Sequence, residues 1–347
     1  MNITQSIESF YSDVPVISDN KNYWLIRTSS GEYYESFIKY SYIALGYNEI
    51  SLEAVNTLKT SAKNNGEVIK NLKNLVIETY RNKENEVKRP GLIANQIFTF
   101  TYDIKKGDIV VIPSRNSDEI FFGIVEESFL SNSDQHFLDF CPFNRRKKVK
   151  WVKQMNRSEL EPTLFKMFFS HLAVNNITSY GNQIEANLSN YFVRGGEEHL
   201  IFNIQKKEDI GAIDLFQLGF YLLSLTESFF EENELEFSIN DFDVKVNLNS
   251  KGKLKFITKY GKGAFMLALI TVFINGGGGT ISYGNFNMDI KSDGLIQKII
   301  DYQNNKFDQE MVKEIKESMD SLQIENPEDA LELYRQFSVN KRTDDKK

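Results

Sequence analysis

The sequence predicts an α+β protein of two domains, and three observations carry this prediction. Residues 89–125 contain short runs of β-branched and aromatic side chains separated by Gly107 and Pro113, a pattern typical of strands joined by tight turns. Residues 52–62 and 68–82 instead repeat apolar side chains at helical spacing. The chain of 347 residues is also long for a single hydrophobic core.

The stretch 89–125 organises the first domain. We expect strands at 96–102, 109–113 and 120–125, with the sequence Lys-Lys-Gly-Asp at 105–108 as the first turn. Glycine supplies a bend there, and proline ends the hydrogen-bonded ladder of the second strand. This order of strand, turn, strand, hairpin tip and strand predicts the hinge of a small barrel.

The rest of the first half alternates between strands and helices. Ser158 and Glu161 before Pro162 form a helix start signal, whereas residues 33–40 fit either a helix or a strand. The expected elements are a helix at 3–12, a strand at 23–28, a turn at 29–31, a strand at 42–47, helices at 52–62 and 68–82, a loop at 128–144, a basic strand at 145–153 and a helix at 164–174.

The second half predicts hairpins around two apolar helices. Residues 213–230 are apolar over much of a helical surface, and residues 263–274 form the most apolar stretch of the chain. We expect strands at 199–204, 235–239, 242–248 and 254–257, and a charged helix at 310–338 followed by a disordered tail. The expected domains are 1–160 and 175–300, with a helical C-terminal arm at 301–347.

The motifs of the first half resemble a known group of domains. A strand with Trp24 and Arg27, a strand ending in Gly46-Tyr47, the run KKGDIVVIP, the run GIV and a closing strand with Trp151 follow one another in order. They resemble PUA-like domains of the EVE type and of the recognition domains of modified-cytosine restriction proteins. Over about residues 20–160, the resemblance implies a β-barrel with a helical insertion that recognises nucleic acid. It further implies a role in bacterial restriction or antiphage defence.

Composition limits the function classes. A single cysteine, Cys141, excludes a disulfide framework and a thiolate zinc site, and the N-terminus lacks a signal-peptide pattern, so we expect a cytoplasmic protein. The net charge is −7, but residues 1–160 hold 21 basic and 20 acidic side chains, whereas the remainder holds 20 and 28. The first half is therefore the part that can approach phosphates without net repulsion.

A set of aromatic, amide and basic side chains in the first half is the candidate binding site. A pocket for an extruded base needs ring faces above and below it, with side chains that hydrogen-bond its edge. Aromatic residues that alternate along strands are also typical of a core, and this alternative stays open. The candidates are Trp24, Arg27, Tyr42, Tyr47, Asn95, Gln96, Phe98 and Phe100.

The run at 145–153 holds six cations in nine residues. With the period of a strand, Val149 and Trp151 face inward while Lys148 and Lys150 face out. Such a run suits phosphates, and it equally suits an edge strand protected by lysine. The candidate phosphate-binding residues are Arg115, Arg145, Arg146, Lys147, Lys148 and Lys150.

Two weaker patterns lie in the second half. Asp243 and Lys245, with Asp214 or Asp241 as a partner, match the end of a metal-nuclease pattern, as does a second Asp-x-Lys at 289–291. Asp and Lys that simply face water give the same spacing. The segment 263–282 is apolar first and then glycine-rich. It predicts a buried helix, with membrane insertion or an oligomer contact as alternatives, and the glycines at 276–279 lack the residues of a phosphate-binding loop.

These observations favour binding over catalysis. The histidines at 136, 171 and 199 lack a metal-ligand spacing, and no nucleophile motif is present, so we expect neither a cofactor nor a metal. The expected partner is DNA, RNA or a nucleotide-derived ligand, recognised by the first domain. The second domain would relay that event through a homo-oligomer or another partner.

Overall fold

The computed structural model divides the chain into two compact units. One unit is residues 20–181, and the other combines residues 1–19 with 182–347. The structure describes residues 7, 11, 14, 16–81, 88–127, 140–206, 208–235, 238–247, 252–259, 262–272, 274, 282–283, 286–287 and 309–324. Four predicted features lie largely or wholly outside these residues. They are the helix at 3–12, the loop at 128–144, the glycines at 276–279 and the Asp-x-Lys at 289–291.

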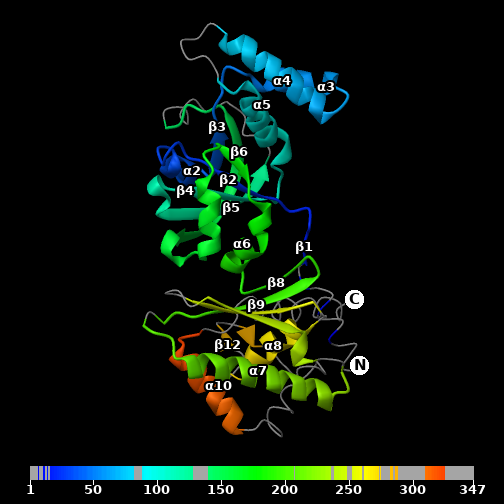
Figure 1. Cartoon of the computed structure of the whole chain (residues 1–347), viewed down its shortest axis with the longest axis vertical. Coiled ribbons are helices and arrows are strands. Elements are labelled where there is room, and N and C mark those ends of the chain that lie inside the picture. Colours follow the sequence, from blue (N-terminus) through cyan, green and yellow to red (C-terminus); the bar gives the residue numbers. More distant parts are fainter. Residues whose placement is uncertain are drawn as a thin grey trace. The chain divides into compact units, whose positions relative to one another are not determined.

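The first unit is built on a six-stranded sheet in the order β3-β6-β5-β4-β2-β7 (Figure 1). Neighbouring strands are antiparallel except for β2 and β4, which are parallel. The strands are β2 (Tyr23–Ile26), β3 (Tyr42–Leu45), β4 (Ile109–Pro113), β5 (Glu119–Glu127), β6 (Arg145–Asn156) and β7 (Val174–Asn176).

The sheet curls where β5 crosses β6. The register between these strands shifts twice, after Phe122 and after Val125, and such bulges bend a strand and increase its twist. Gly123 lies at the first shift, and a Cβ atom there would come within 2.3 Å of the Val149 side chain and 2.6 Å of the Trp151 ring. Only glycine therefore permits the close packing that curls the sheet into a half-barrel.

Helices fill the segments between β2 and β3 and between β3 and β4. They are α2 (Tyr34–Lys39), α3 (Leu52–Ser61), α4 (Asn65–Tyr80) and α5 (Pro90–Phe98), which continues as a π-helix at Thr99–Asp103. The expected helices at 52–62 and 68–82 are confirmed, and residues 33–40 are mostly helical. The strand expected at 96–102 is wrong: Pro90 starts a helix there, and tertiary packing overrides the strand propensity of the aromatic run.

The segment before β7 also differs from expectation. A 3₁₀ helix covers Pro162–Phe169, so the start signal at Pro162 is confirmed, but the helix expected to reach residue 174 ends at 169. Val174 begins β7, which pairs with β2. This pairing is why the first unit extends to residue 181 and beyond the expected limit of 160.

The second unit has a five-stranded sheet in the order β1-β8-β9-β11-β10. The strands are β1 (Val16–Ile17), β8 (Tyr191–Arg194), β9 (Glu197–Asn203), β10 (Phe242–Asn247) and β11 (Lys253–Thr258), and a separate short ladder joins β12 (Ser282–Tyr283) to β13 (Phe286–Asn287). β1 pairs in parallel with β8, so the N-terminus belongs to this unit. Residues 236–237 of the strand expected at 235–239 lie outside the described residues, and a 3₁₀ turn begins at Ile239 and ends at Asp241.

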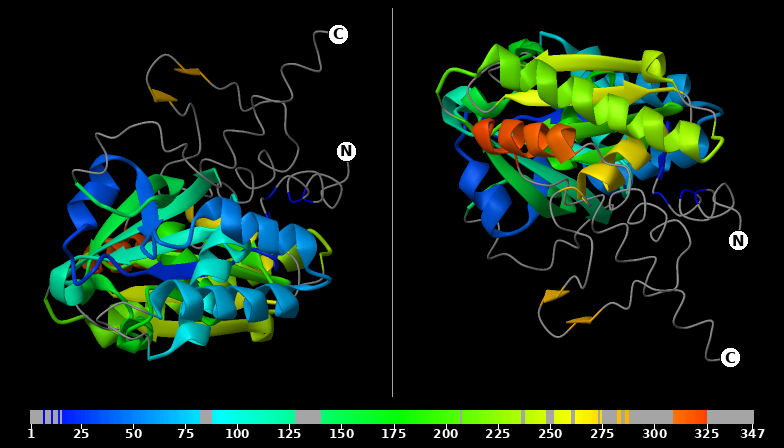
Figure 2. Two further views of the ribbon diagram at one scale, coloured as in Figure 1. Left: turned by 90° about the horizontal axis from the view of Figure 1, so that it is seen from above. Right: turned by 90° about the horizontal axis from the view of Figure 1, so that it is seen from below.

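The described residues of the second unit form four α-helices. They are α6 (Gly181–Leu188), α7 (Ala212–Glu232), α8 (Gly263–Val272) and α10 (Gln309–Ser321), and α7 and α10 lie side by side (Figure 2). Ile315, Met319 and Leu322 join the core formed by α7, α8 and the sheet. The described part of the expected C-terminal arm is therefore a packed helix of this unit, because its apolar side chains need a partner surface.

All ten residues of α8 are buried, as expected for a core helix. Among the helices that the structure describes, none combines the length and the apolar character needed to cross a membrane.

Candidate binding pocket

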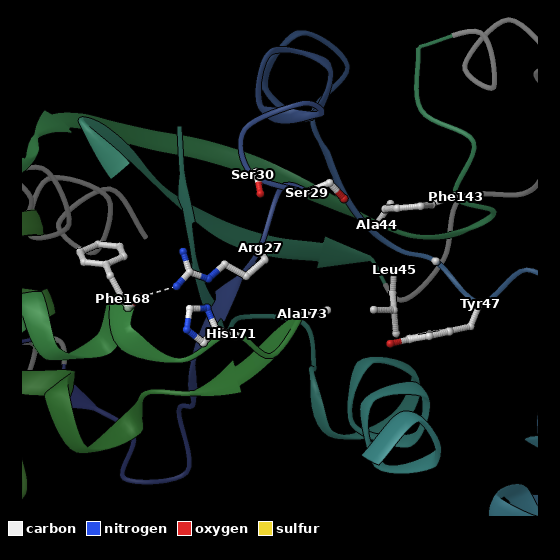
Figure 3. A pocket seen from close by; sticks show the side chains of 11 residues that line it. Arg27, Ser29, Ser30, Ala44, Leu45, Tyr47, Phe143, Phe168, His171 and Ala173 are labelled. Carbon is white, nitrogen blue, oxygen red and sulfur yellow. Dashed lines mark hydrogen bonds between the residues drawn. The ribbon is translucent and has the colours of Figure 1, made fainter. Parts of the chain in front are cut away.

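A pocket of about 650 Å³ is lined by the end of the edge strand β3 and by the segment that leads into the other edge strand, β7. This volume lies within the range of small-molecule sites. Four separate segments supply its walls, and Figure 3 shows them from close by. The lining residues are Arg27, Ser29, Ser30, Ala44, Leu45, Gly46, Tyr47, Phe143, Phe168, His171 and Ala173.

The pocket has two chemically different ends (Figure 3). Leu45, Tyr47 and Phe143 gather at one end, whereas Arg27 and His171 lie at the other. Aromatic and aliphatic surface at one end suits the flat faces of a ring. A guanidinium and an imidazole at the other end suit an anionic or carbonyl group, because both can donate hydrogen bonds.

Arg27 is half-buried and is held from one side only. Its Nε and Nη2 donate to the carbonyl oxygen of Ser170 at 3.1 and 2.6 Å, and Nη2 also donates to that of Phe168. No carboxylate pairs with Arg27 and no acceptor contacts its Nη1 within the described chain. Burial lowers the pKa of the guanidinium from its usual value, yet an arginine stays charged at neutral pH. The pocket therefore contains a cation whose Nη1 can still donate hydrogen bonds to a ligand.

Three non-glycine residues of the wall have left-handed backbones. The φ angles are 53° at Ser29, 57° at Ser30 and 65° at Tyr47. This region costs an ordinary L-residue about 1–2 kcal/mol, and such strain tends to gather where a fold positions a ligand. Short-range hydrogen bonds hold two of these residues: Glu32 N–H donates to Ser29 O at 3.1 Å, and Ile50 N–H donates to Tyr47 O at 3.1 Å.

Arg145 and Arg146 brace the loops that carry the pocket's rings. Arg145 donates to the carbonyl oxygens of Gly46 at 3.1 Å and Ile50 at 2.5 Å, on either side of Tyr47. Arg146 donates to the carbonyl oxygens of Phe143 at 2.8 Å and Cys141 at 2.7 Å, and its guanidinium lies 4.6 Å from the centre of the Tyr42 ring. Both arginines are buried.

The prediction that residues 145–147 belong to an exposed phosphate-binding run is therefore wrong. Lys147 is also buried, and its ammonium donates to the carbonyl oxygens of Ile104 at 2.6 Å and Thr101 at 3.3 Å. The inward and outward alternation expected farther along the strand is present: Val149 is buried and Lys150 is exposed. Lys148 is half-exposed and pairs with Glu126 at 3.5 Å, and Arg115 is exposed.

The predicted base-binding set separates into two groups. Arg27 and Tyr47 line the pocket. Four others are instead buried in the core of the first unit, in agreement with the alternative that alternating aromatic residues form a core: Trp24, Tyr42, Phe98 and Phe100. Trp24 donates its indole N–H to Asp108 at 2.8 Å, and the Tyr42 hydroxyl lies 2.6 Å from that of Ser36.

The two predicted amides do not reach the pocket. Gln96 is buried and bonds the main chain of Val174. Asn95 is exposed on α5 and donates to the carbonyl oxygen of Gly91 at 2.9 Å. Their assignment to a ligand depended on a strand at 96–102, and a helix directs them elsewhere.

Sequence reasoning missed most of the wall. Phe143, Phe168, His171 and Ala173 come from segments expected to be a loop or a helix, and the Ser29-Ser30 turn was expected without a role. The one available signal was the pair of consecutive serines before Gly31. The other residues become neighbours only because β7 pairs with β2 across more than a hundred residues of sequence.

The metal-nuclease alternative has no assembled site among the described residues. Asp243 and Lys245 are exposed on the edge strand β10, and the Asp214 carboxylate accepts a hydrogen bond from Ser321 at 2.5 Å. No group of three potential metal ligands comes together in this part of the chain. The pattern instead fits charged residues that face solvent.

Comparison with protein-family models gives a match to the first unit. A family model described as a domain of unknown function, DUF8426, matches residues 23–178, which lie entirely within the first unit. No curated protein and no solved structure matches the chain. The matched region contains every residue that lines the pocket.

Proposed function

We propose that the first unit is a recognition module whose pocket receives one heterocycle of a nucleic acid or of a free nucleotide. The observation that carries the proposal is the arrangement of Arg27 opposite Tyr47 and Phe143 in one pocket. Rings offer stacking surfaces that every base can use, and the guanidinium offers hydrogen bonds to a phosphate or to a carbonyl edge.

The PUA-like resemblance extends this proposal to a biological role. In this role the protein works in the cytoplasm of a bacterium, in a restriction or antiphage defence system, and recognises a modified or extruded base. The exposed Lys150 and Arg115 would then add attraction to the phosphate backbone, with affinity that falls as salt rises. The second unit would pass the binding event to a partner.

The test is a binding titration on the full chain. Purified protein is first examined by mass spectrometry for co-purifying nucleotides, then titrated with mononucleotides and with modified and unmodified DNA and RNA at low and high salt. Arg27→Gln should weaken binding about tenfold or more, because the lost charged hydrogen bond contributes about 1.5–3 kcal/mol. Arg115→Gln is the matched control and should change affinity only at low salt.

A second variant isolates the ring. Tyr47→Asn removes the aromatic surface but keeps a residue type that tolerates a left-handed backbone. It should weaken binding about as much as the arginine variant. Because Tyr47 also packs against the core of the first unit, urea unfolding checks that the variant is folded under the conditions of the titration. Binding that survives both substitutions, or the absence of binding to every nucleotide and oligonucleotide tried, would refute the proposal.

A further inference from the structure

The edge strand β10 of the second unit is exposed on both faces. It pairs with β11 on one side, and no other described strand pairs with it. Val244 and Val246 are 46% and 40% exposed, and Asp243 and Lys245 between them are exposed as well. An edge with unpaired backbone groups and apolar side chains is a template for another strand.

The two faces of β10 differ in chemistry. Val244 lies opposite Phe256 and Val246 opposite Leu254 of β11, so these valines share the face on which the core helices pack. Asp243 and Lys245 point to the opposite face. Within the described residues neither of these two charged groups forms an ion pair.

We propose that two copies of this chain associate by antiparallel pairing of their β10 strands about a two-fold axis at Val244. In this register Asp243 lies opposite the partner's Lys245 and Lys245 lies opposite the partner's Asp243. On the other face, Val244 meets its own copy and Phe242 meets the partner's Val246. Opposite charges and apolar pairs that lie directly opposite each other both stabilise a sheet, and a two-fold contact must be self-complementary in this way.

The neighbouring registers are disfavoured by charge. Moving the axis to residue 243 places two aspartates directly opposite each other, and moving it to residue 245 does the same with two lysines. Like charges in directly opposed positions are destabilising. An axis that passes between two residues, for example between Asp243 and Val244, would place Asp243 opposite the partner's Val244. The face of one sheet that packs against its core helices would then be continuous with the opposite face of the other sheet. Of these registers, only the one with its axis at Val244 pairs opposite charges and apolar side chains without opposing like charges.

Helix α7 provides additional apolar surface on the same side of the sheet. Ile213, Phe216 and Phe220 are 70%, 70% and 61% exposed, and their spacing places them along one side of the helix. A two-fold axis perpendicular to the sheet keeps both α7 helices on the same face of the joined sheet. The dimer therefore brings the exposed apolar surface of both copies to one side.

The test measures the mass of the full chain in solution, by light scattering after size exclusion and by sedimentation equilibrium. The wild type should have twice the mass of one chain. D243K and K245D should each raise the dimer dissociation constant about tenfold or more, because each places like charges face to face twice. The double variant D243K/K245D should restore the dimer, and an equimolar mixture of the two single variants should form a heterodimer.

Lys70→Asp is the control, since Lys70 is an exposed lysine on α4 of the first unit and its reversal should leave the dimer intact. Circular dichroism checks that each variant is folded. A wild type that is monomeric at all concentrations, single variants that remain dimeric, or a mixture that stays monomeric would each overturn the proposal. This outcome is independent of nucleotide binding by the first unit.

Discussion

The side-chain amide of Gln96 pairs with the main chain of Val174. Gln96 Nε2 donates to Val174 O at 2.9 Å, and Val174 N–H donates to Gln96 Oε1 at 2.6 Å. β7 is an edge strand, so this amide occupies the place that a neighbouring strand would take. A residue from α5 thereby anchors the strand that follows Ala173, a residue of the pocket wall.

The first prediction concerns this anchor. Gln96→Leu should lower the free energy of unfolding by about 2–3 kcal/mol, because it leaves the buried N–H and C=O of Val174 without partners. Urea unfolding measures the effect. Asn95→Leu, on the adjacent exposed position, should stay within about 0.5 kcal/mol of the wild type. Equal effects of the two substitutions would contradict the structural role assigned to Gln96.

The second prediction separates the cations of β6 by role. Arg145→Met should weaken ligand binding in the pocket and lower the free energy of unfolding by about 3 kcal/mol, because the carbonyls of Gly46 and Ile50 lose charged donors. Lys150→Met should leave stability within about 0.5 kcal/mol and reduce the salt dependence of nucleic-acid binding by about one unit of slope. Binding as a function of salt, with urea unfolding alongside, distinguishes the two effects; a stable Arg145→Met variant would speak against the bracing role.

The third prediction concerns the pH dependence contributed by Lys147. Burial lowers the pKa of this ammonium from 10.5 to about 8, although Asp108 and Asp103 partly oppose the shift. Between about pH 8 and pH 10.5 the folded chain has released the proton while the unfolded chain still holds it, so stability should rise with pH in this window. The gain is about 3 kcal/mol.

The comparison variant for this prediction is Lys147→Met, which lacks the titrating group. The difference in unfolding free energy between wild type and variant should change across the window, while contributions from other groups cancel. A difference that stays constant from about pH 7 to about pH 10 would show that the ammonium is not desolvated in the fold.

The fourth prediction concerns His199 in the second unit. Its ring stacks on Phe192 with centroids 4.5 Å apart. Burial, with Lys245, Lys255 and Arg194 nearby, lowers its pKa from 6.5 to about 4. Glu197 lies 3.7 Å from Nε2 but is partly exposed, and it forms an ion pair only with a protonated ring.

A lowered histidine pKa makes the fold sensitive to acid. Between about pH 6.5 and pH 4 the unfolded chain binds a proton that the folded chain does not, so stability should fall by about 3 kcal/mol as pH drops through this window. His199→Phe keeps an aromatic ring against Phe192 and should remove this component. Unfolding in urea at several pH values measures it, and parallel acid dependence of wild type and variant would disprove the assignment.

The sequence correctly predicted those elements that begin or end at residues with strong backbone preferences or that carry a regular apolar spacing. The turn at Gly107, with φ of 91°, the strand that ends at Pro113 and the helices α3 and α4 follow from backbone preferences and apolar spacing. The aromatic run 96–102 misled because its residue types favour a strand, whereas packing against the sheet and β7 selects a helix. Propensity is a weak preference that tertiary contacts override.

The sequence by itself determined the α+β class, the order of most strands and helices, and the alternation along β6 that turns Val149 inward and Lys150 outward. The tertiary structure decided which side chains share a pocket and what the buried cations do. Arg145 and Lys147 look like phosphate ligands in the sequence, but in the fold they satisfy backbone carbonyls that would otherwise be buried without donors. The physical reason is that pairing between distant strands such as β2 and β7 is set by burial and hydrogen bonding across the whole unit, which no local pattern encodes.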